Sequence, residues 1–511
     1  MEVKKILIVG GGTAGIMTAA LLSKVFKDKL DITLIHSNKI GTIGVGESST
    51  ASLHSFMKFI GLEEKDWMEE SSAVYKYGGR FMNWSKKGDH FVLVENEQTL
   101  YINQKTNLLQ YLLKYHENDP HKINELFLSP TLALQNLSPT VDDELSYIPT
   151  YSDIESVYSY NFDAVKFAEV IKKKVCIPNG VKFVEGDLKQ VKLDDFGFIQ
   201  DIKLWDQQKF KADLYIDCSG FKGALIEAVM GEPFISFEES LFCDKAIAAP
   251  IPYKDKHSEM EPYSRLYTMN SGWLWKTPIY DRIGSGYVYS SKYITDEEAE
   301  KEFREFHGGY EGDVLKINMR VGTRERVAVK NVVACGLAGG FAEPMESTGI
   351  STFQGIMSTL ATELEKNELN YTSQTIDTIN RDNIDMMIDI RDFIHAHYLT
   401  CQRDDTPFWR DCKTKSFIPD TLMQKLQIMA VRPAEELFRG RIFGSVNWFQ
   451  WLWGTGFFYN NPFGRTPRVS IKENYLPYME KKIDLIKYET KLLTELLPNL
   501  YEQLREKYGR D

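Results

Sequence analysis

The sequence predicts an α/β fold, with a Rossmann-type dinucleotide-binding domain and an added, more helical C-terminal region. Three observations support this prediction. The chain opens with an apolar run, a glycine-rich turn and a helical pattern. Later apolar runs at 212–217 and 330–335 also enter glycine turns, which is typical of buried parallel strands. Beyond about residue 369 the pattern becomes mainly helical.

The N-terminal segment predicts a complete β-α-β unit. Lys5–Val9 is a short apolar run typical of a buried strand. A helical pattern then extends to about Phe26, and the apolar run Asp31–Ser37 predicts the second strand. The order of these elements is the one that dinucleotide-binding domains use.

Gly10, Gly12 and Gly15 form a GxGxxG fingerprint between the first strand and the helix. The first glycine permits a tight turn, the second lets the backbone approach a pyrophosphate, and the third allows close packing of the helix. Thr13 and Ala14 lie in the same turn, where helix amides would face the phosphates. A glycine turn without a nucleotide is the alternative, but the strand-turn-helix context favours a dinucleotide.

The end of the second strand departs from the usual dinucleotide pattern. An Asp or Glu is expected there to bind the ribose hydroxyls, whereas this chain has His36 followed by Ser37. His36 either contacts the ribose itself or is an ordinary residue at the end of a strand. We therefore predict loose binding of the dinucleotide.

The middle of the chain combines helical and extended patterns. A glycine loop covers Gly41–Thr50, and the pattern from 51 to about 127 is mainly helical. Gly78-Gly79 and an extended segment, DHFVLV at 89–94, interrupt it. Residues 175–220 alternate apolar and polar in short runs and predict strands and hairpins. Residues 245–291 predict a further set of extended segments.

The rest of the chain completes the predicted organisation. After the strand at 330–335, a glycine-rich turn leads into a helix whose apolar positions include Ile350, Phe353 and Met357. Residues 1–368 are interpreted as a discontinuous nucleotide domain with inserted strands for the substrate side, and 369–511 as a mainly helical region. The latter contains helices at Gln374–Thr400, an aromatic-rich stretch at Pro407–Phe463 and a charged amphipathic helix at Tyr478–Tyr508.

The composition excludes several classes of protein. With 43% hydrophobic and 26% charged residues, the 511-residue chain can bury a sizeable core. The net charge is −11 and no long basic run is present, so a nucleic-acid partner has no support. No run of about 18 apolar residues predicts a membrane span. The six cysteines form no CxxC pair, and together with the absence of a signal peptide they favour reduced thiols in a cytoplasmic protein.

Three segments outside the fingerprint carry a family resemblance. They are YKYGGRFMNW at 75–84, GWLWKTP at 272–278 and GFAEPMESTG at 340–349. With the fingerprint and GVGES at 44–48, they resemble the flavin-dependent tryptophan halogenase family over most of the chain. Thr277 stands where that family usually has Ile, and Ser48 where it often has Ala. The resemblance implies that the dinucleotide is FAD and that its domain is of the flavin monooxygenase kind.

The resemblance implies a two-component halogenation. A separate flavin reductase would supply reduced FAD by diffusion, since no second GxGxxG for NADPH is present. Oxygen and a halide ion, chloride or bromide, would then yield hypohalous acid. That species would reach Lys76, which hydrogen-bonds it or becomes a haloamine, and an electron-rich indole-, tryptophan- or phenol-like substrate would be halogenated. The preferred substrate and halide stay open, as does a homo-oligomeric state.

Lys76 and Glu346 are the catalytic residues that the resemblance implies. A buried lysine could act because burial disfavours the ammonium and leaves a nucleophilic amine. Alternatively, Lys76 lies near a helix C-terminus, with Gly78 as the stop signal. Glu346 could position hypohalous acid or take the ring proton, or it could simply be an acid at a helix start.

The resemblance also suggests the remaining site residues. The amides of Thr348 and Gly349, at a predicted helix start, would bind the halide because helix starts attract anions. Trp273 and Trp275, two apart on a presumed strand, would wall off the flavin side, although core packing explains them almost equally well. Besides the fingerprint and His36, the implied FAD-binding residues are Gly46, Glu47, Gly336, Pro344 and Ile350.

Two other functions fit parts of this pattern. An FAD-dependent aromatic monooxygenase would hydroxylate its substrate beside the flavin, but it gives no reason for Lys76 or the EPMESTG turn. A non-catalytic Rossmann carrier that binds a protein partner is the third reading. No metal site is expected, because His395 and His397 lie two apart on a predicted helix and diverge. The aromatic residues of 445–464 line either a substrate pocket or the core.

Overall fold

The start of the chain forms the predicted β-α-β unit in the structure, which is a computed structural model. β1 (Lys5–Val9), α1 (Thr13–Phe26) and β2 (Asp31–His36) follow in that order. The structure describes residues 1–38, 46–86, 88, 90–94, 111–115, 122, 124, 127–141, 158–432, 441–460, 463–464 and 476–510. Part of the predicted glycine loop, at 41–45, lies outside the described residues.

β1 lies inside a six-stranded sheet with the order β20-β21-β12-β1-β2-β8. The pairs within it are parallel except for β20, which runs antiparallel to β21. The added strands are β8 (Lys182–Glu185), β12 (Leu214–Asp217), β20 (Ala328–Val329) and β21 (Val332–Ala334). β12 and β21 are fully buried, as strands of a parallel sheet covered on both faces should be. The predicted fold class is confirmed.

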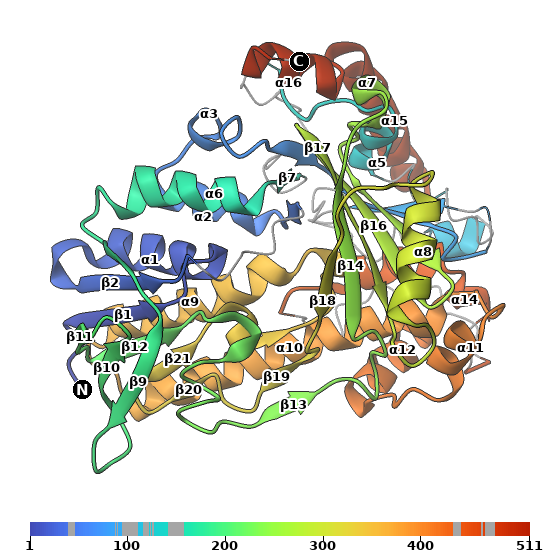
Figure 1. Cartoon of the computed structure of the whole chain (residues 1–511). Helices are drawn as coiled ribbons and strands as arrows, with labels where there is room; N and C mark the ends of the chain where they lie inside the picture. The colour runs from blue at the N-terminus through green and yellow to red at the C-terminus, as the bar shows by residue number, and fades with distance from the viewer. Residues whose placement is uncertain are drawn as a thin grey trace.

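Helices cover this sheet and connect it to the rest of the chain. α1 packs against α6 (Ala164–Ile171) and against α9 (Gly349–Lys366). Figure 1 shows α6 beyond α1 on the same side of the sheet. α9 follows the glycine-rich turn after β21, where the sequence predicts a helix. α9 therefore lies beside α1, the helix that follows the fingerprint.

A second, seven-stranded sheet has the order β18-β14-β17-β16-β15-β5-β6. β5 pairs with β15 in parallel, and the other neighbours are antiparallel. Its strands are β5 (Gly78–Met82), β6 (His90–Val94), β14 (Lys245–Ile251), β15 (Ser264–Met269), β16 (Gly272–Ile279), β17 (Arg282–Tyr289) and β18 (Leu315–Asn318). Ala299 and Phe303 of α8 (Asp296–Phe306) share a small core with this sheet. The predicted extended region at 245–291 is confirmed.

The prediction of a mainly helical region after residue 51 is wrong for residues 74–82. α2 (Ser52–Ile60) and α3 (Glu64–Trp67) form, but β4 (Val74–Lys76) and β5 follow them. The cause is pairing with distant segments, because β4 pairs with β7 and β5 pairs with β15. Tyr75, Tyr77 and Phe81 are separated by two and then four residues. A spacing of two fits a strand and a spacing of four fits a helix, so the pattern does not distinguish them. The extended segment predicted at 89–94 is confirmed by β6.

Three smaller sheets complete the strand inventory of the described residues. One has the order β3-β7-β4, with β3 (Glu47–Ser48) and β7 (Ser159–Phe162). The others are β11-β10-β9 and β13-β19-β22. Their strands are β9 (Leu188–Leu193), β10 (Ile199–Leu204), β11 (Lys209–Phe210), β13 (Phe234–Ser236), β19 (Gly322–Arg324) and β22 (Gly340–Phe341). The strands and hairpins predicted within 175–220 are confirmed.

Every described element after residue 373 is a helix. The longest, α10 (Ser373–Thr400), packs on α9. The others are α11 (Pro407–Thr414), α12 (Asp420–Val431), α13 (Ser445–Gly454), α14 (Phe457–Asn460), α15 (Leu476–Leu496) and α16 (Leu500–Tyr508), while α5 (Leu128–Leu134) and α7 (Lys256–Glu259) occur earlier. The predicted single helix at Tyr478–Tyr508 is wrong, because Pro498 interrupts it and the Asn499 side chain caps α16.

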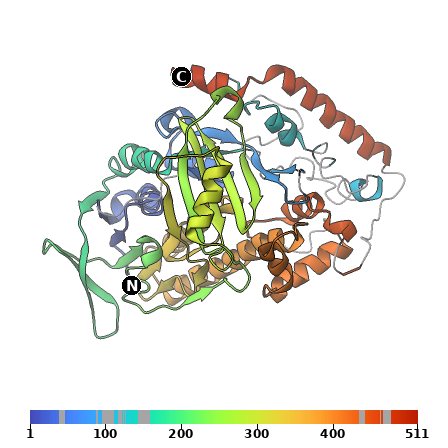
Figure 2. The ribbon, with the colours of Figure 1, turned by 45° about the vertical axis from the view of Figure 1, so that its right-hand side comes forward.

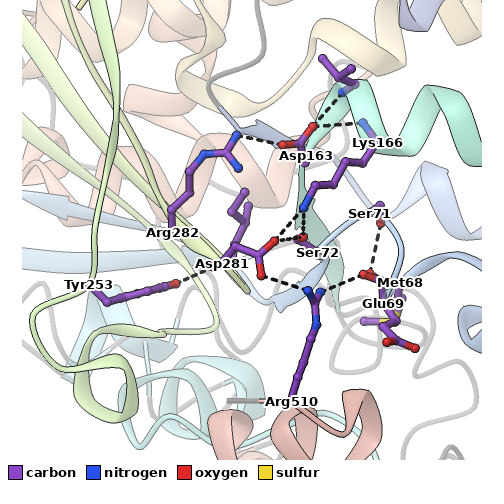
Figure 3. Close-up of polar contacts among 12 residues, drawn as sticks. Met68, Glu69, Ser71, Ser72, Asp163, Lys166, Tyr253, Asp281, Arg282 and Arg510 are labelled. Atoms are coloured by element: carbon purple, nitrogen blue, oxygen red, sulfur yellow. Dashed lines mark hydrogen bonds and ion pairs between the residues drawn. The ribbon is translucent and has the colours of Figure 1, made fainter. Parts of the chain in front are cut away.

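The C-terminal end of the chain is fastened beside β4. Tyr508 donates a hydrogen bond to the Ala73 carbonyl (2.8 Å). Asp281 accepts from Lys166 Nζ (2.7 Å) and from Ser72, and it pairs with Arg510 at 3.4 Å (Figure 3). The chain termini lie far apart in both views, with the C-terminus at the upper edge of Figure 2. No helix of the described residues is long and apolar enough to cross a membrane.

Candidate active site

Lys76 ends β4 and points into the interior. β3 and β4 flank β7 in the β3-β7-β4 sheet, and the Lys76 side chain reaches Ser49, which follows β3 directly. Its side chain is 4% exposed, and Nζ donates to the Ser49 carbonyl (2.8 Å) and to Ser347 Oγ (3.1 Å). The alternative position near a helix C-terminus is wrong. Both of these acceptors are neutral oxygens.

Glu346 closes the short 3-10 turn η7 (Pro344–Glu346). Its side chain is 11% exposed, and Oε1 lies 2.6 Å from Nε2 of the fully buried His397. The next residue, Ser347, has a left-handed backbone (φ 57°), a conformation that few non-glycine residues adopt. That turn directs the Ser347 hydroxyl to Lys76, and such unusual backbone angles often occur at functional sites.

The fold brings the two predicted catalytic residues together. Lys76, Glu346 and Ser347 line one cavity with a volume of about 720 Å³. Leu93 and Leu266 of the seven-stranded sheet and Phe443, just before α13, contribute apolar surface to the same cavity. A cavity of this size with a few convergent polar groups is typical of small-molecule sites.

Trp273 and Trp275 lie on β16 and share one face, as the two-residue spacing predicts. Their ring centroids are 6.0 Å apart with an interplanar angle of 51°. Trp273 is fully buried, whereas Trp275 is half-buried. Gly286, opposite Trp275 on β17, makes room for that ring, because a Cβ at Gly286 would lie 2.1 Å from it. The neighbouring strand β17 therefore determines where the Trp275 ring lies.

Glu343, three residues before Glu346, is a second buried carboxyl. It is fully buried, and it accepts from Trp273 Nε1 (2.8 Å) and from the Tyr398 hydroxyl. Its other oxygen, Oε1, has no hydrogen-bond partner among the described residues. Burial raises the pKa of Glu343 to about 7, against the two hydrogen bonds that lower it. Glu343 thus fixes Trp273 on β16.

The fingerprint glycines form a cradle that fits the pyrophosphate of a dinucleotide. Gly10 has φ +122°, and a Cβ there would lie 2.1 Å from the Cys218 carbonyl oxygen. A Cβ at Gly15 would lie 1.9 Å from the Gly10 carbonyl oxygen. Gly12 precedes Thr13 at the start of α1, which has no side-chain cap and no acidic residue in its first turn. The first-turn amides can therefore face an anionic ligand.

Two further predicted FAD-binding residues lie beside this cradle. His36 ends β2, and a Cβ added at Gly11 would lie 2.5 Å from its Cβ. Gly336 has φ +68°, and a Cβ there would lie 2.8 Å from that of Ala14. Both positions thus adjoin the turn between β1 and α1, as the resemblance implies.

A second group of predicted residues gathers at the start of α9. These residues belong to β3 or the residue just before it, to the turn before α9, or to the first turn of α9: Gly46, Glu47, Pro344, Thr348, Gly349 and Ile350. A Cβ at Gly349 would lie 3.6 Å from Glu47 Oε1, and burial raises the pKa of Glu47 to about 7. α9, like α1, starts without a side-chain cap or an acid in its first turn. That helix start suits a halide ion.

The structure also adds residues that the sequence could not assign. His397 pairs with Glu346, while His395 bonds Ser416, so the two histidines diverge as expected. Of the aromatic residues whose role stayed open, Trp448, Trp451, Phe457 and Phe458 are buried and Tyr459 is 45% exposed. Trp451 stacks on His397 at a centroid distance of 3.6 Å. No pattern in the sequence signals these contacts between separate helices.

Comparison with known proteins agrees with this geometry. The family described as tryptophan halogenase matches residues 5–464. The chain is similar to the tryptophan 7-halogenase RebH of Lentzea aerocolonigenes, at 33% identity over 100% of this chain and 99% of that protein. It is also similar to the tryptophan 6-halogenase SttH of Streptomyces toxytricini, at 31% identity over 98% and 97% of the two chains.

Solved structures give the same result. The crystal structure of SttH has a TM-score of 0.88 at 30% identity and covers 98% of this chain and 99% of its own. A tryptophan halogenase structure from Shewanella frigidimarina has a TM-score of 0.86 at 26% identity, covering 99% and 98%. The chain therefore belongs to the flavin-dependent tryptophan halogenase family.

Proposed function

We propose that this chain halogenates an electron-rich, indole-, tryptophan- or phenol-like aromatic substrate, using reduced FAD, molecular oxygen and a halide ion. The observation that carries the proposal is the meeting of Lys76 and Glu346 at one cavity, linked through Ser347. A hydroxylase that works beside its flavin has no use for this pair. The named activities of RebH and SttH support halogenation of tryptophan-like rings.

The predicted cofactor residues divide into three tasks. The fingerprint residues Gly10, Gly12, Thr13, Ala14 and Gly15 would hold the FAD pyrophosphate, with His36 and Gly336 next to it. The amides of Thr348 and Gly349 would hold the halide, and Gly46, Glu47, Pro344 and Ile350 would complete the flavin side. When bound, reduced FAD with oxygen supplies the oxidising equivalents that convert halide into hypohalous acid.

Trp273 and Trp275 would act as the wall between flavin and substrate. Glu343 holds the Trp273 ring by a hydrogen bond. Gly286 has no side chain and so leaves space for the Trp275 ring. A fixed wall keeps the organic substrate away from the flavin and lets only a small oxidant pass to Lys76. Core packing, the alternative role of these tryptophans, fits the same burial.

Lys76 would deliver the halogen. Its Nζ either donates a hydrogen bond to hypohalous acid or reacts with it, forming an N–X bond and releasing water. In both cases the ring supplies the electron pair for the new C–X bond, and the X–O or X–N bond breaks. The ring proton then passes to Glu346, whose Oε1 is held by His397 while the other oxygen remains for the cavity.

A coupled assay tests this proposal. The chain is supplied with a flavin reductase, NADH, FAD and bromide or chloride, and indoles and phenols are screened by mass spectrometry. We expect a product that is heavier than its substrate only when halide is present. The same product should form when chemically reduced FAD replaces the reductase. Lys76→Ala and Glu346→Gln should each lower the rate by about a hundredfold or more. Lys366→Ala, at an exposed lysine of α9, is the matched control.

Three outcomes would each contradict a part of the proposal. A hydroxylated product formed without dependence on halide would replace the halogenase by the aromatic monooxygenase. Undiminished halogenation by Lys76→Ala would remove that lysine from the mechanism. Dependence on physical contact with one particular reductase would contradict delivery of reduced FAD by diffusion.

A further inference from the structure

One face of α9 forms a groove that leads away from the catalytic pair. Ser351, Gln354, Ser358, Thr362 and Glu365 all line the cavity that contains Lys76 and Glu346. Their spacing of three or four residues places them on one stripe of the helix. From Ser351 to Glu365 this stripe is about 21 Å long at roughly 1.5 Å per residue.

A second wall of the groove comes from α1 and α2. Ser52, Ser55 and Phe59 of α2 line the same cavity at helical spacing, and Leu21 and Val25 of α1 lie beside them. Ser52 Oγ donates to Gln354 Oε1 at 2.8 Å, which ties α2 to α9. The groove is thus built from regular, packed helices of the described chain.

The cavity has a buried end and an exposed end. Lys76, Ser347 and Gln354 are buried and Ser351 is half-buried, whereas Ser358, Thr362 and Glu365 are exposed. On α2, Phe59 is 49% exposed. The lining therefore leads from the catalytic pair to the surface of the molecule. A free aromatic amino acid would occupy only the inner end.

The chemistry of the lining suits a chain of peptide groups. Serine and threonine hydroxyls and the Gln354 amide can both donate and accept hydrogen bonds, as a peptide backbone requires. Phe59, Leu21 and Val25 offer apolar contacts between these polar groups. Ser52 already pairs with Gln354, but a purely hydrocarbon chain would strip the exposed Ser358 and Thr362 hydroxyls of water without replacing its hydrogen bonds, which is unfavourable.

We propose that the aromatic ring is presented on a peptide. The ring enters the inner end of the cavity at Lys76 and Glu346, while the adjoining residues lie along the groove between α2 and α9. This inference rests on the proposed halogenation and names its substrate class. At about 3.5 Å per residue, a groove of roughly 21 Å holds about six extended residues.

A series of substrates tests the proposal. Indole, free tryptophan, and tryptophan extended by two, four or six residues at either end are compared in the halogenation assay. We expect kcat/KM to rise by about tenfold or more from tryptophan to the best peptide, because added contacts favour the longer chain. Calorimetric titration of tryptophan and of each peptide into the protein without flavin should rank their affinities in the same order as kcat/KM.

Two tryptophan substitutions on α9 separate the groove from general effects. Ser358→Trp should lower the ratio of kcat/KM for the peptide to that for indole by about tenfold, because the ring fills the outer groove. Lys366→Trp, outside the lining and exposed, should leave that ratio unchanged.

The possible results are distinguishable. If small aromatics are halogenated but no peptide surpasses free tryptophan in kcat/KM, the peptide inference is overturned and the halogenase proposal stands. If no aromatic compound, free or peptidic, is halogenated, the proposed function itself fails. An unchanged peptide-to-indole ratio in Ser358→Trp would also overturn the assignment of the groove.

Discussion

Glu346 Oε1 lies 2.6 Å from His397 Nε2, and this contact determines where a proton must sit. His397 Nδ1 lies 2.7 Å from the Phe393 carbonyl oxygen, which can only accept, so Nδ1 carries a hydrogen. The short contact at Nε2 therefore needs one more proton, either on an imidazolium or on a neutral Glu346. Stacking on Trp451 and complete burial hold the ring in this orientation.

Uncharged aromatic rings surround this pair. Phe81, Trp84 and Trp451 face His397 from neighbouring elements. Lys76 lines the same cavity as Glu346. His397 is thus a positioning residue that holds Oε1 of Glu346.

His397→Phe is predicted to impair halogenation. Phe preserves an aromatic ring beside Trp451 but removes the hydrogen bond at Glu346. The Glu346 carboxyl then loses the contact that orients it for the ring proton. We expect kcat to fall by about tenfold to a hundredfold near neutral pH.

His395→Phe is the matched control for that variant. It removes a second buried histidine of α10, which bonds Ser416 and lies away from Glu346. Its kcat should equal that of the parent chain. His397→Gln, which keeps a donor, should recover part of the rate. Equal kcat values for His397→Phe and the parent would remove His397 from the mechanism.

Glu343→Gln is predicted to weaken the pH dependence of stability. Burial raises the pKa of Glu343 from an ordinary 4.5 to about 7, so between these values the folded chain binds more protons than the unfolded chain. Stability then falls as pH rises, by at most roughly 3 kcal/mol in total. Gln does not titrate, so the variant should gain stability relative to the parent as pH increases from about 5 to 8.

Urea unfolding at both pH values measures this difference. Glu238→Gln, at an exposed glutamate, should show no such change. Glu47 is present in both chains, so its own titration cancels in the comparison. A constant stability difference between Glu343→Gln and the parent across this range would mean that Glu343 is ionised throughout.

Asp281→Asn is predicted to loosen the C-terminal attachment with the opposite pH dependence. Burial alone would raise the pKa of Asp281, but hydrogen bonds from Lys166 and Ser72 outweigh it and the pKa is lowered (Figure 3). Its contribution is therefore present above the unfolded pKa and lost as pH falls through the folded one. Asp281 is partly exposed, so we expect a loss of no more than about 1 kcal/mol at neutral pH.

Limited proteolysis at the C-terminus provides a second measure of this variant. Asp281→Asn should be cleaved there faster than the parent, because Arg510 loses its ion pair. Arg510→Lys retains the charge and should behave like the parent. Equal cleavage rates for Asp281→Asn and the parent would show that Tyr508 and its bond to Ala73 suffice to fasten the chain.

Local patterns predicted the parts of the fold that local chemistry determines. The fingerprint at Gly10–Gly15, the buried strands β12 and β21 and the amphipathic face of α9 each combine periodicity with glycine turns. The identity of the site residues came from the family resemblance, because no local pattern distinguishes Lys76 from an ordinary lysine. Their meeting at one cavity agrees with that resemblance.

Contacts between distant segments account for what the sequence missed. β4 forms only because β7 pairs with it, and the residues between 51 and 127 carry no sign of that partner. The pairing of His397 with Glu346 likewise depends on the packing of α10 against the turn before α9. Sequence periodicity describes one element at a time, so such relationships appear only in three dimensions.

His36 gives the last prediction, which concerns flavin affinity. His36 occupies the position where an acid usually binds the ribose hydroxyls, and it lies against Gly11 of the fingerprint turn. His36→Asp should therefore tighten FAD binding by about tenfold, since a carboxylate accepts from two hydroxyls. Glu185→Gln, at the exposed register neighbour of His36 on β8, should leave the affinity unchanged.

Titration of FAD with fluorescence detection measures both affinities. The parent should bind oxidised FAD loosely, and a low-nanomolar dissociation constant would contradict that expectation. Weaker FAD binding by His36→Asp would contradict the predicted tightening. The carboxylate would then repel the nearby pyrophosphate, because no cation compensates its charge. That result would mean that His36 itself contacts the ribose or the phosphate and that this chain replaces the usual acid with an imidazole donor.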